Sequence, residues 1–167
     1  MNRNEMNKQT KLSPHFTLGE LCKTSVNSLD GNIPSPEDIE NLKRLCPWLE
    51  ELRLRYNERY VCGRATGTRV SLEEPIIITS GYRSPEVNKC VGGAYSSNHL
   101  TGCAVDIRCV GVEQAIRYAA ILLDFADEWK QDYDELLIER NRKGRYWVHF
   151  AVRPKDNRRR TMFLTAS

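Results

Sequence analysis

Two short segments far apart in the sequence constrain the fold more than any other feature. The first, SGYRSPEVNKCVGGAYSSNHLTGCAVDI, runs from Ser80 to Ile107 and contains His99 and Asp106; the second, YWVHF, contains His149. The pattern of apolar residues predicts that Asp106 and His149 each lie within a β-strand, CAVDIRCV and RYWVHFAV. If the three side chains meet, the fold must place these strands together.

Two imidazoles and one carboxylate form a suitable ligand set for a catalytic zinc ion. Such sites commonly use three protein ligands and leave the fourth tetrahedral position to water. Asp106 follows His99 by seven positions, which is too long a step for one helical turn, so we expect a turn at Gly102 to bring them together. The sequence therefore predicts Zn²⁺ bound by His99, Asp106 and His149. The third histidine, His15, has no acidic or thiol neighbour at useful spacing, and we expect it not to bind metal.

Composition indicates one globular domain. Hydrophobic residues make up 40% of the 167 residues, and the net charge of +3 is too small to indicate a nucleic-acid partner. The polar N-terminus lacks the apolar run of a signal peptide or membrane anchor, so we expect synthesis in the cytoplasm, reduced thiols at the six cysteines, and a monomer. We expect a disordered lead at 1–13, the domain at 14–153 and a solvated basic tail at 154–167, with Arg158, Arg159 and Arg160 in a row.

Local patterns predict the other elements. A capping box at Ser35 and Asp38 starts a helix in which Pro47 predicts a kink or restart, and Tyr56 to Leu72 has no sustained period and predicts a loop or hairpin. We also expect a central strand at Ile76–Thr79, a short helix from Ser84 to about Cys90, a helix from about Val112 to Glu128, and strands at 135–140 and 145–152.

The last two strands suggest a base for hydrolysis. A hairpin loop of Arg142, Lys143 and Gly144 sets Glu139 opposite Trp147 and on the same face as His149, whereas a loop one residue longer would turn Glu139 to the other face. Glu139 is therefore our candidate general base. Arg83 follows a strand end and could hold a substrate carboxylate or the tetrahedral oxygen; pairing with Glu86 or a backbone carbonyl at the surface is an equally good interpretation.

The order of these residues closely resembles the M15 family of zinc peptidases, which includes D-alanyl-D-alanine carboxypeptidases, dipeptidases and phage endolysins. The pattern SxHxxGxAxD matches from Ser97 to Asp106 and WVH matches at 147–149, with FTLGEL and GNIP as further similarities. The resemblance implies an α+β fold of helices on a small antiparallel sheet, of the hedgehog and DD-peptidase kind. It implies His99, Asp106 and His149 as zinc ligands, with substrate contacts from Arg83 and Ser97. We also expect Trp147 to contact the substrate.

Two departures from the family pattern affect the catalytic assignment. Many relatives carry the catalytic acid three residues before the last histidine, where this chain has Tyr146, so the role passes to Glu139. The segment at 56–72 has no clear counterpart. We expect a zinc peptidase acting on peptidoglycan stem peptides next to D-alanine, on the cell wall after release or export. The alternative is a non-catalytic zinc-containing binding module of the same fold.

Overall fold

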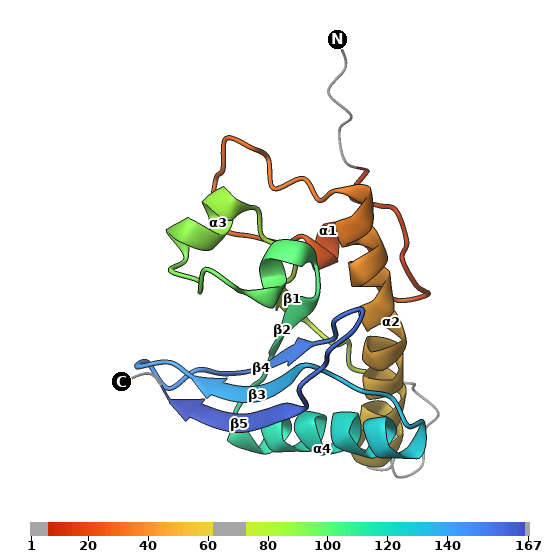
Figure 1. The fold of residues 1–167 in the computed structure, drawn as a ribbon. Helices are drawn as coiled ribbons and strands as arrows, with labels where there is room; N and C mark the ends of the chain where they lie inside the picture. Colours follow the sequence, from red (N-terminus) through yellow and green to blue (C-terminus); the bar gives the residue numbers. More distant parts are fainter. Residues whose placement is uncertain (1–6, 62–72, 166–167) are drawn as a thin grey trace.

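The computed structural model describes residues 7–61 and 73–165, and its centre is one five-stranded sheet (Figure 1). The strands lie in the order β1-β2-β4-β3-β5. Their bounds are β1 Ile78–Ser80, β2 Ala104–Arg108, β3 Glu135–Arg140, β4 Tyr146–Ala151 and β5 Arg160–Thr165. The helices are α1 Leu18–Leu21, α2 Pro36–Tyr56, α3 Pro85–Cys90 and α4 Val112–Glu128, with a π-helix at Asn57–Val61 and a 3-10 helix, η3, at Asn98–Thr101.

One face of the sheet is buried against α2 and α4. Val105 and Ile107 from β2 and Val148 and Phe150 from β4 are fully buried there. Trp48 of α2 packs edge-on against Phe125 of α4 and also contacts Phe150, which joins the two helices to the sheet. Because side chains alternate along a strand, the residues between these, including Asp106 and His149, lie on the opposite face. The buried face therefore fixes the position of the polar one.

The predicted α+β class is confirmed, but the sheet is mixed, not antiparallel. β1, β2, β4 and β3 pair antiparallel, whereas β5 runs parallel to β3 along its whole length. The expected solvated tail therefore contains a strand. At the other end, residues 7–13 of the expected disordered lead include Lys11, which forms a bridge with Thr17. The division into lead, domain and tail stays a prediction.

Three local predictions need correction. The restart offered as one interpretation of Pro47 does not occur, because α2 is a single helix whose apolar face packs on the core along its length; the kink stays a prediction. The Ile76–Thr79 strand was expected to be central, but β1 lies at a sheet edge, where α1 covers it. Asn57–Val61 continues α2 as a π-helix in place of a loop or hairpin; residues 62–72 lie outside the described chain, as does Cys62.

Two glycines fix the turns that position the polar face. Gly102 has φ +68°, and a Cβ there would lie 2.5 Å from the backbone oxygen of Asp38, so only glycine lets the turn before β2 touch α2. Gly144 has φ +76° in the β3–β4 loop, where Asn141 pairs with Arg145 as the three-residue loop predicts.

Among the described residues no helix is both long and apolar enough to cross a bilayer.

Candidate metal centre

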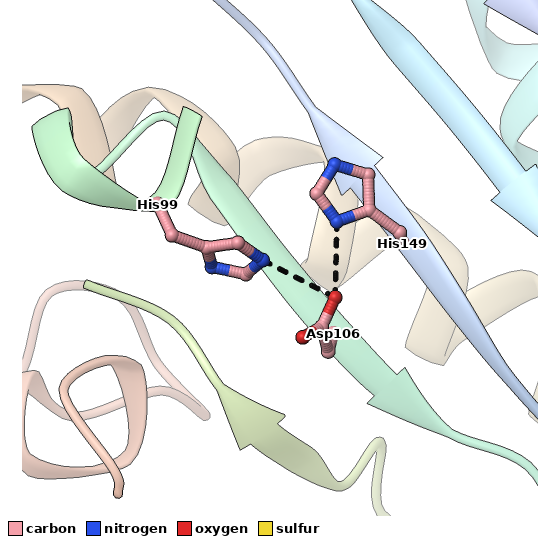
Figure 2. A group of neighbouring side chains, drawn as sticks. All are labelled: His99, Asp106 and His149. Carbon is pink, nitrogen blue, oxygen red and sulfur yellow. Dashed lines mark hydrogen bonds and ion pairs between the residues drawn. The ribbon is translucent and has the colours of Figure 1, made fainter. Parts of the chain in front are cut away.

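The three predicted ligands meet on the polar face of the sheet. His99 comes from η3, Asp106 from β2 and His149 from β4, and Asp106 pairs directly with His149 across the two strands. Oδ1 of Asp106 lies 3.3 Å from Nε2 of His99 and 3.0 Å from Nδ1 of His149, so both rings face one carboxylate oxygen (Figure 2). One ligand atom from each residue lies within 4.8 Å of the others.

This spacing fits a tetrahedral metal ion. Zinc bonds of about 2.0–2.2 Å to nitrogen and oxygen place neighbouring ligand atoms roughly 3.3–3.5 Å apart, close to the two measured separations. All three residues are buried, with 2% exposure for His99, 8% for Asp106 and 7% for His149. The buried carboxylate and the two imidazoles together form a donor set that could hold a metal ion.

Each histidine has an acceptor on its other nitrogen. Nδ1 of His99 lies 2.7 Å from the carbonyl oxygen of Gly81, and Nε2 of His149 lies 3.2 Å from Oε2 of Glu135. A carbonyl or carboxylate oxygen can only accept, so the outer nitrogens donate to Gly81 and Glu135. Asp106 is also a carboxylate, so without a metal the inner nitrogens, Nε2 of His99 and Nδ1 of His149, donate to it; a bound metal ion would take their lone pairs in place of those protons.

The charges in the cluster shift its pKa values in opposite directions. Burial raises the pKa of Asp106, but the charge of His99 and hydrogen bonds from both histidines outweigh it and hold the pKa far below its usual range. Burial lowers the pKa of His149, yet its contacts with Asp106 and Glu135 prevail and raise the pKa to about 9. A metal ion replaces such a proton when it binds, and so it would take over the charge balance of the site.

Arg83 lies beside the cluster, not at the surface. Its Nη2 donates to Oδ2 of Asp106 over 2.6 Å, and its Nε donates to the hydroxyl of Ser80 over 2.8 Å. Glu86, the partner in the surface interpretation, accepts instead from the backbone N–H groups of Leu29 and Asp30.

A polar cavity of about 450 Å³ opens over the cluster. The predicted site residues Arg83, Ser97, Glu139 and Trp147 line it together with the three candidate ligands. The hydroxyl of Ser97 accepts from the backbone N–H of His99 over 3.3 Å, so this residue also caps the turn that carries the ligand. Every residue named as a site candidate is therefore at one cavity.

Glu139 lies on the face that the three-residue loop predicts. It pairs with Trp147 across the hairpin, two positions from the pair of Leu137 with His149. Burial raises the pKa of the Glu139 carboxyl, while the nearby charges of His149 and Arg83 act against that rise. A partly buried carboxylate with a raised pKa is a more basic proton acceptor, as a general base requires.

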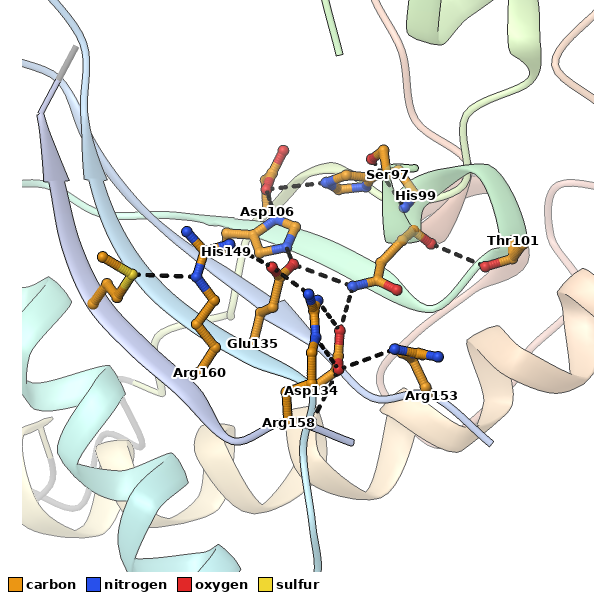
Figure 3. Close-up of polar contacts among 12 residues, drawn as sticks. Ser97, His99, Thr101, Asp106, Asp134, Glu135, His149, Arg153, Arg158 and Arg160 are labelled. Carbon is orange, nitrogen blue, oxygen red and sulfur yellow. Dashed lines mark hydrogen bonds and ion pairs between the residues drawn. The ribbon is translucent and has the colours of Figure 1, made fainter. Parts of the chain in front are cut away.

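Sequence reasoning missed a polar network behind His149 (Figure 3). Glu135 contacts His149 and also accepts from Arg158 and Arg160, both over 3.1 Å. Asp134, whose side chain is fully buried, accepts from both Nε and Nη2 of Arg158. The alternation of β3 carried a signal for Glu135, because it lies four residues before Glu139 and so shares its face.

His15 lies outside the cluster. Its Nδ1 is 2.6 Å from Oε2 of Glu50 in α2, and the same carboxylate also accepts from the hydroxyl of Ser13. Burial raises the pKa of Glu50, but these hydrogen bonds outweigh it and lower the pKa. The contact ties the segment before α1 to α2.

A buried histidine–carboxylate cluster that opens into a polar cavity is typical of metal-dependent hydrolases. The profile of the Peptidase M15 family matches residues 14–126, which is more than half of the chain. The chain therefore belongs to this family of metallopeptidases and is a peptidase with a peptide substrate. No curated protein matched the chain. The matched range includes Arg83, His99 and Asp106 and ends before β3 and β4.

Proposed function

We propose that this peptidase is a zinc enzyme that hydrolyses peptidoglycan stem peptides next to D-alanine, as a carboxypeptidase or an endopeptidase. The observation that carries the proposal is the convergence of His99, Asp106 and His149 at a cavity that Arg83 and Glu139 also line. The resemblance of SxHxxGxAxD and WVH to wall-cleaving members of the family supports this class of substrate. In this proposal the protein acts as a monomer on the cell wall.

Three residues hold the metal in this proposal. His99 and His149 donate through their inner nitrogens and Asp106 through Oδ1, a set that suits zinc because it combines imidazole and carboxylate ligands at tetrahedral spacing. When bound, zinc lowers the pKa of water and polarises the carbonyl of the scissile bond. Arg83 holds the second oxygen of Asp106, which keeps that carboxylate in one orientation.

The remaining cavity residues act on substrate and protons. Glu139 accepts a proton from the attacking water and returns it to the leaving amine. Arg83 retains N–H groups beyond the two that contact Ser80 and Asp106, and these donate to a substrate carboxylate or to the oxygen that gains charge during attack. Ser97 and Trp147, on the cavity wall, flank the peptide.

The alternative is a zinc-containing binding module of the same fold that lacks turnover. The presence of Glu139 and Arg83 at the cavity favours the enzyme, because a binding module needs neither a base nor a cation at the cluster.

Incubation of the purified, zinc-loaded protein with muropeptides, followed by mass spectrometry, tests the proposal. A carboxypeptidase releases one D-alanine per stem peptide, whereas an endopeptidase yields two shorter peptides. The His149→Ala protein should form neither product. If the folded, zinc-loaded protein binds muropeptides without cleaving them, the binding module is the correct interpretation.

A further inference from the structure

We propose that Glu135 is a positioning residue of the metal centre, fixed in place by Arg158 and Arg160 from the C-terminal segment. The inference rests on the proposed metal site and goes beyond it. The sequence predicts a solvated tail for Arg158 and Arg160, and the family profile ends at residue 126, well before all three residues. In the structure the two arginines contact Glu135, and Glu135 in turn contacts His149 (Figure 3).

The first step joins Glu135 to the ring of His149. Nδ1 of His149 lies 3.0 Å from Oδ1 of Asp106, and Nε2 lies 3.2 Å from Oε2 of Glu135. A neutral imidazole carries one N–H, and a carboxylate can only accept a hydrogen bond. When a metal ion takes the Nδ1 lone pair, the one N–H of the ring lies on Nε2 and donates to Glu135, which fixes the orientation of the ring. Outer partners of this kind fix ligand geometry in metal sites generally.

The second step fixes Glu135 itself. Oε1 accepts from Nη2 of Arg158 and Nη1 of Arg160, while Oε2 accepts from Nδ2 of Asn98 over 3.1 Å as well as facing His149. Only 13% of the Glu135 side chain is exposed. Each carboxylate oxygen therefore has two partners, and rotation of the group would break several charge-assisted contacts. Asn98 precedes His99 in η3, so the network reaches both histidine-bearing elements.

The backbone places Arg158 and Arg160 close enough to Glu135 to fix its carboxylate. Arg160 pairs directly with Glu135 in the parallel ladder between β5 and β3. Arg158 is held by the buried carboxylate of Asp134 through Nε at 2.9 Å and Nη2 at 2.7 Å. The arginine side chains are 51% and 45% exposed, and ion pairs at such exposure contribute little to stability. Their larger effect is on the carboxylate that orients His149.

Neighbouring arginines provide a matched comparison. Arg159 carries the same charge as Arg160 but pairs with Asp127 and Asp132, and it does not line the cavity. We would measure zinc affinity by competition with a chromophoric chelator, and the visible absorption of the Co²⁺-loaded protein, for Glu135→Leu, Glu135→Gln, Arg160→Ala and Arg159→Ala. Outer-partner changes typically lower metal affinity about 10- to 100-fold. We expect that loss for Glu135→Leu, with an altered Co²⁺ spectrum.

The other variants separate positioning from general stability. Glu135→Gln should recover most of the affinity, because its amide oxygen still accepts from Nε2 of His149. Arg160→Ala should weaken zinc binding and Arg159→Ala should not. Wild-type affinity and spectrum in a folded Glu135→Leu protein, or equal effects of the two arginine changes, would overturn the inference while the metal site stands. If Glu135→Leu does not fold, the two arginine variants decide. If His149→Ala keeps wild-type zinc affinity, the proposed metal site fails, and this inference fails with it.

Discussion

Arg83 and Asp106 form an ion pair of 2.6 Å between Nη2 and Oδ2, on the side of the carboxylate away from both histidines. One oxygen of Asp106 thus serves the arginine, and the other serves the candidate metal ligands. The side chains are only 15% and 12% exposed, so water screens the pair weakly. Arg83 can therefore hold Asp106 in position and still present its remaining N–H groups to the cavity.

Replacement of Arg83 by alanine should impair catalysis much more than folding. Loss of one donor to the developing oxyanion typically lowers turnover on the order of 10²- to 10³-fold, and we expect a loss of that size. With zinc in excess the zinc content should be kept, because the three ligands remain, while the affinity should fall because Arg83 is an outer partner of Asp106. Peptidase assays, metal analysis and melting temperature check this, with Arg59→Ala as control, since Arg59 pairs with Asp124 away from the cavity. Full activity of Arg83→Ala would remove Arg83 from the site.

Zinc should bind at about one ion per chain. The His99→Ala and His149→Ala proteins should each lose most of it, because each removes one of three protein ligands. His15→Ala is the control, since His15 pairs with Glu50 and should leave zinc content unchanged. Elemental analysis of the dialysed proteins measures this. A histidine whose alanine variant keeps full occupancy is not a ligand.

Glu139→Gln should lower turnover by about 10²- to 10⁴-fold, the usual contribution of a positioned general base. Zinc content should not change, because Glu139 is not a proposed ligand. Single-turnover cleavage of a muropeptide measures the effect, with Glu128→Gln on α4 as a control carboxylate. If Glu139→Gln is active and Glu135→Gln loses turnover with zinc retained, Glu135 is the base.

Asp134 should make the protein sensitive to acid. Burial raises its pKa, but hydrogen bonds from Arg158 and Asn98 outweigh that and lower the pKa from 3.8 to about 2. A carboxyl with a lower pKa when folded stabilises the fold above its unfolded pKa, and this contribution is lost as pH falls from about 4 to about 2. Because Arg158 is half exposed, we expect on the order of 1–2 kcal/mol.

Urea unfolding of the wild type and of Asp134→Asn at pH 6 and pH 2.5 measures this contribution. The wild type should lose more free energy of unfolding between the two pH values than the variant, since the variant has no carboxyl to protonate at 134. Parallel losses in the two proteins would contradict the prediction. The other acidic groups titrate in both proteins and cancel in the comparison.

The local parts of the site could be predicted from sequence. The alternation in CAVDIRCV places Asp106 on the face opposite the core, and the loop ending in Gly144 sets the register that brings Glu139 opposite Trp147. Both depend on neighbouring residues only. The proximity of His99 to Asp106 could also be predicted from neighbouring residues, because Gly102 provides the turn between them.

The errors concern partners that are distant in sequence. Ile76 and Ile78 are buried although β1 has a neighbouring strand on one side only, because α1 packs against it. An apolar sequence therefore does not distinguish an edge strand from a central one. Arg160 has no evident partner in the sequence until β5 pairs with β3, since Glu135 is 25 residues away. Apolar periodicity carries no information on which strand a polar terminal segment will join.

The parallel pairing of β5 with β3 has a consequence for the order of assembly during synthesis. Of the described strands, β5 leaves the ribosome last, after His99, Asp106 and His149 have all emerged. The nascent chain therefore holds all three candidate ligands before Arg160 can reach Glu135. A polypeptide halted after β4 would contain the ligands and Glu135 but lack Arg158 and Arg160, which fix the Glu135 carboxylate, and we expect it to bind zinc less tightly than the finished chain.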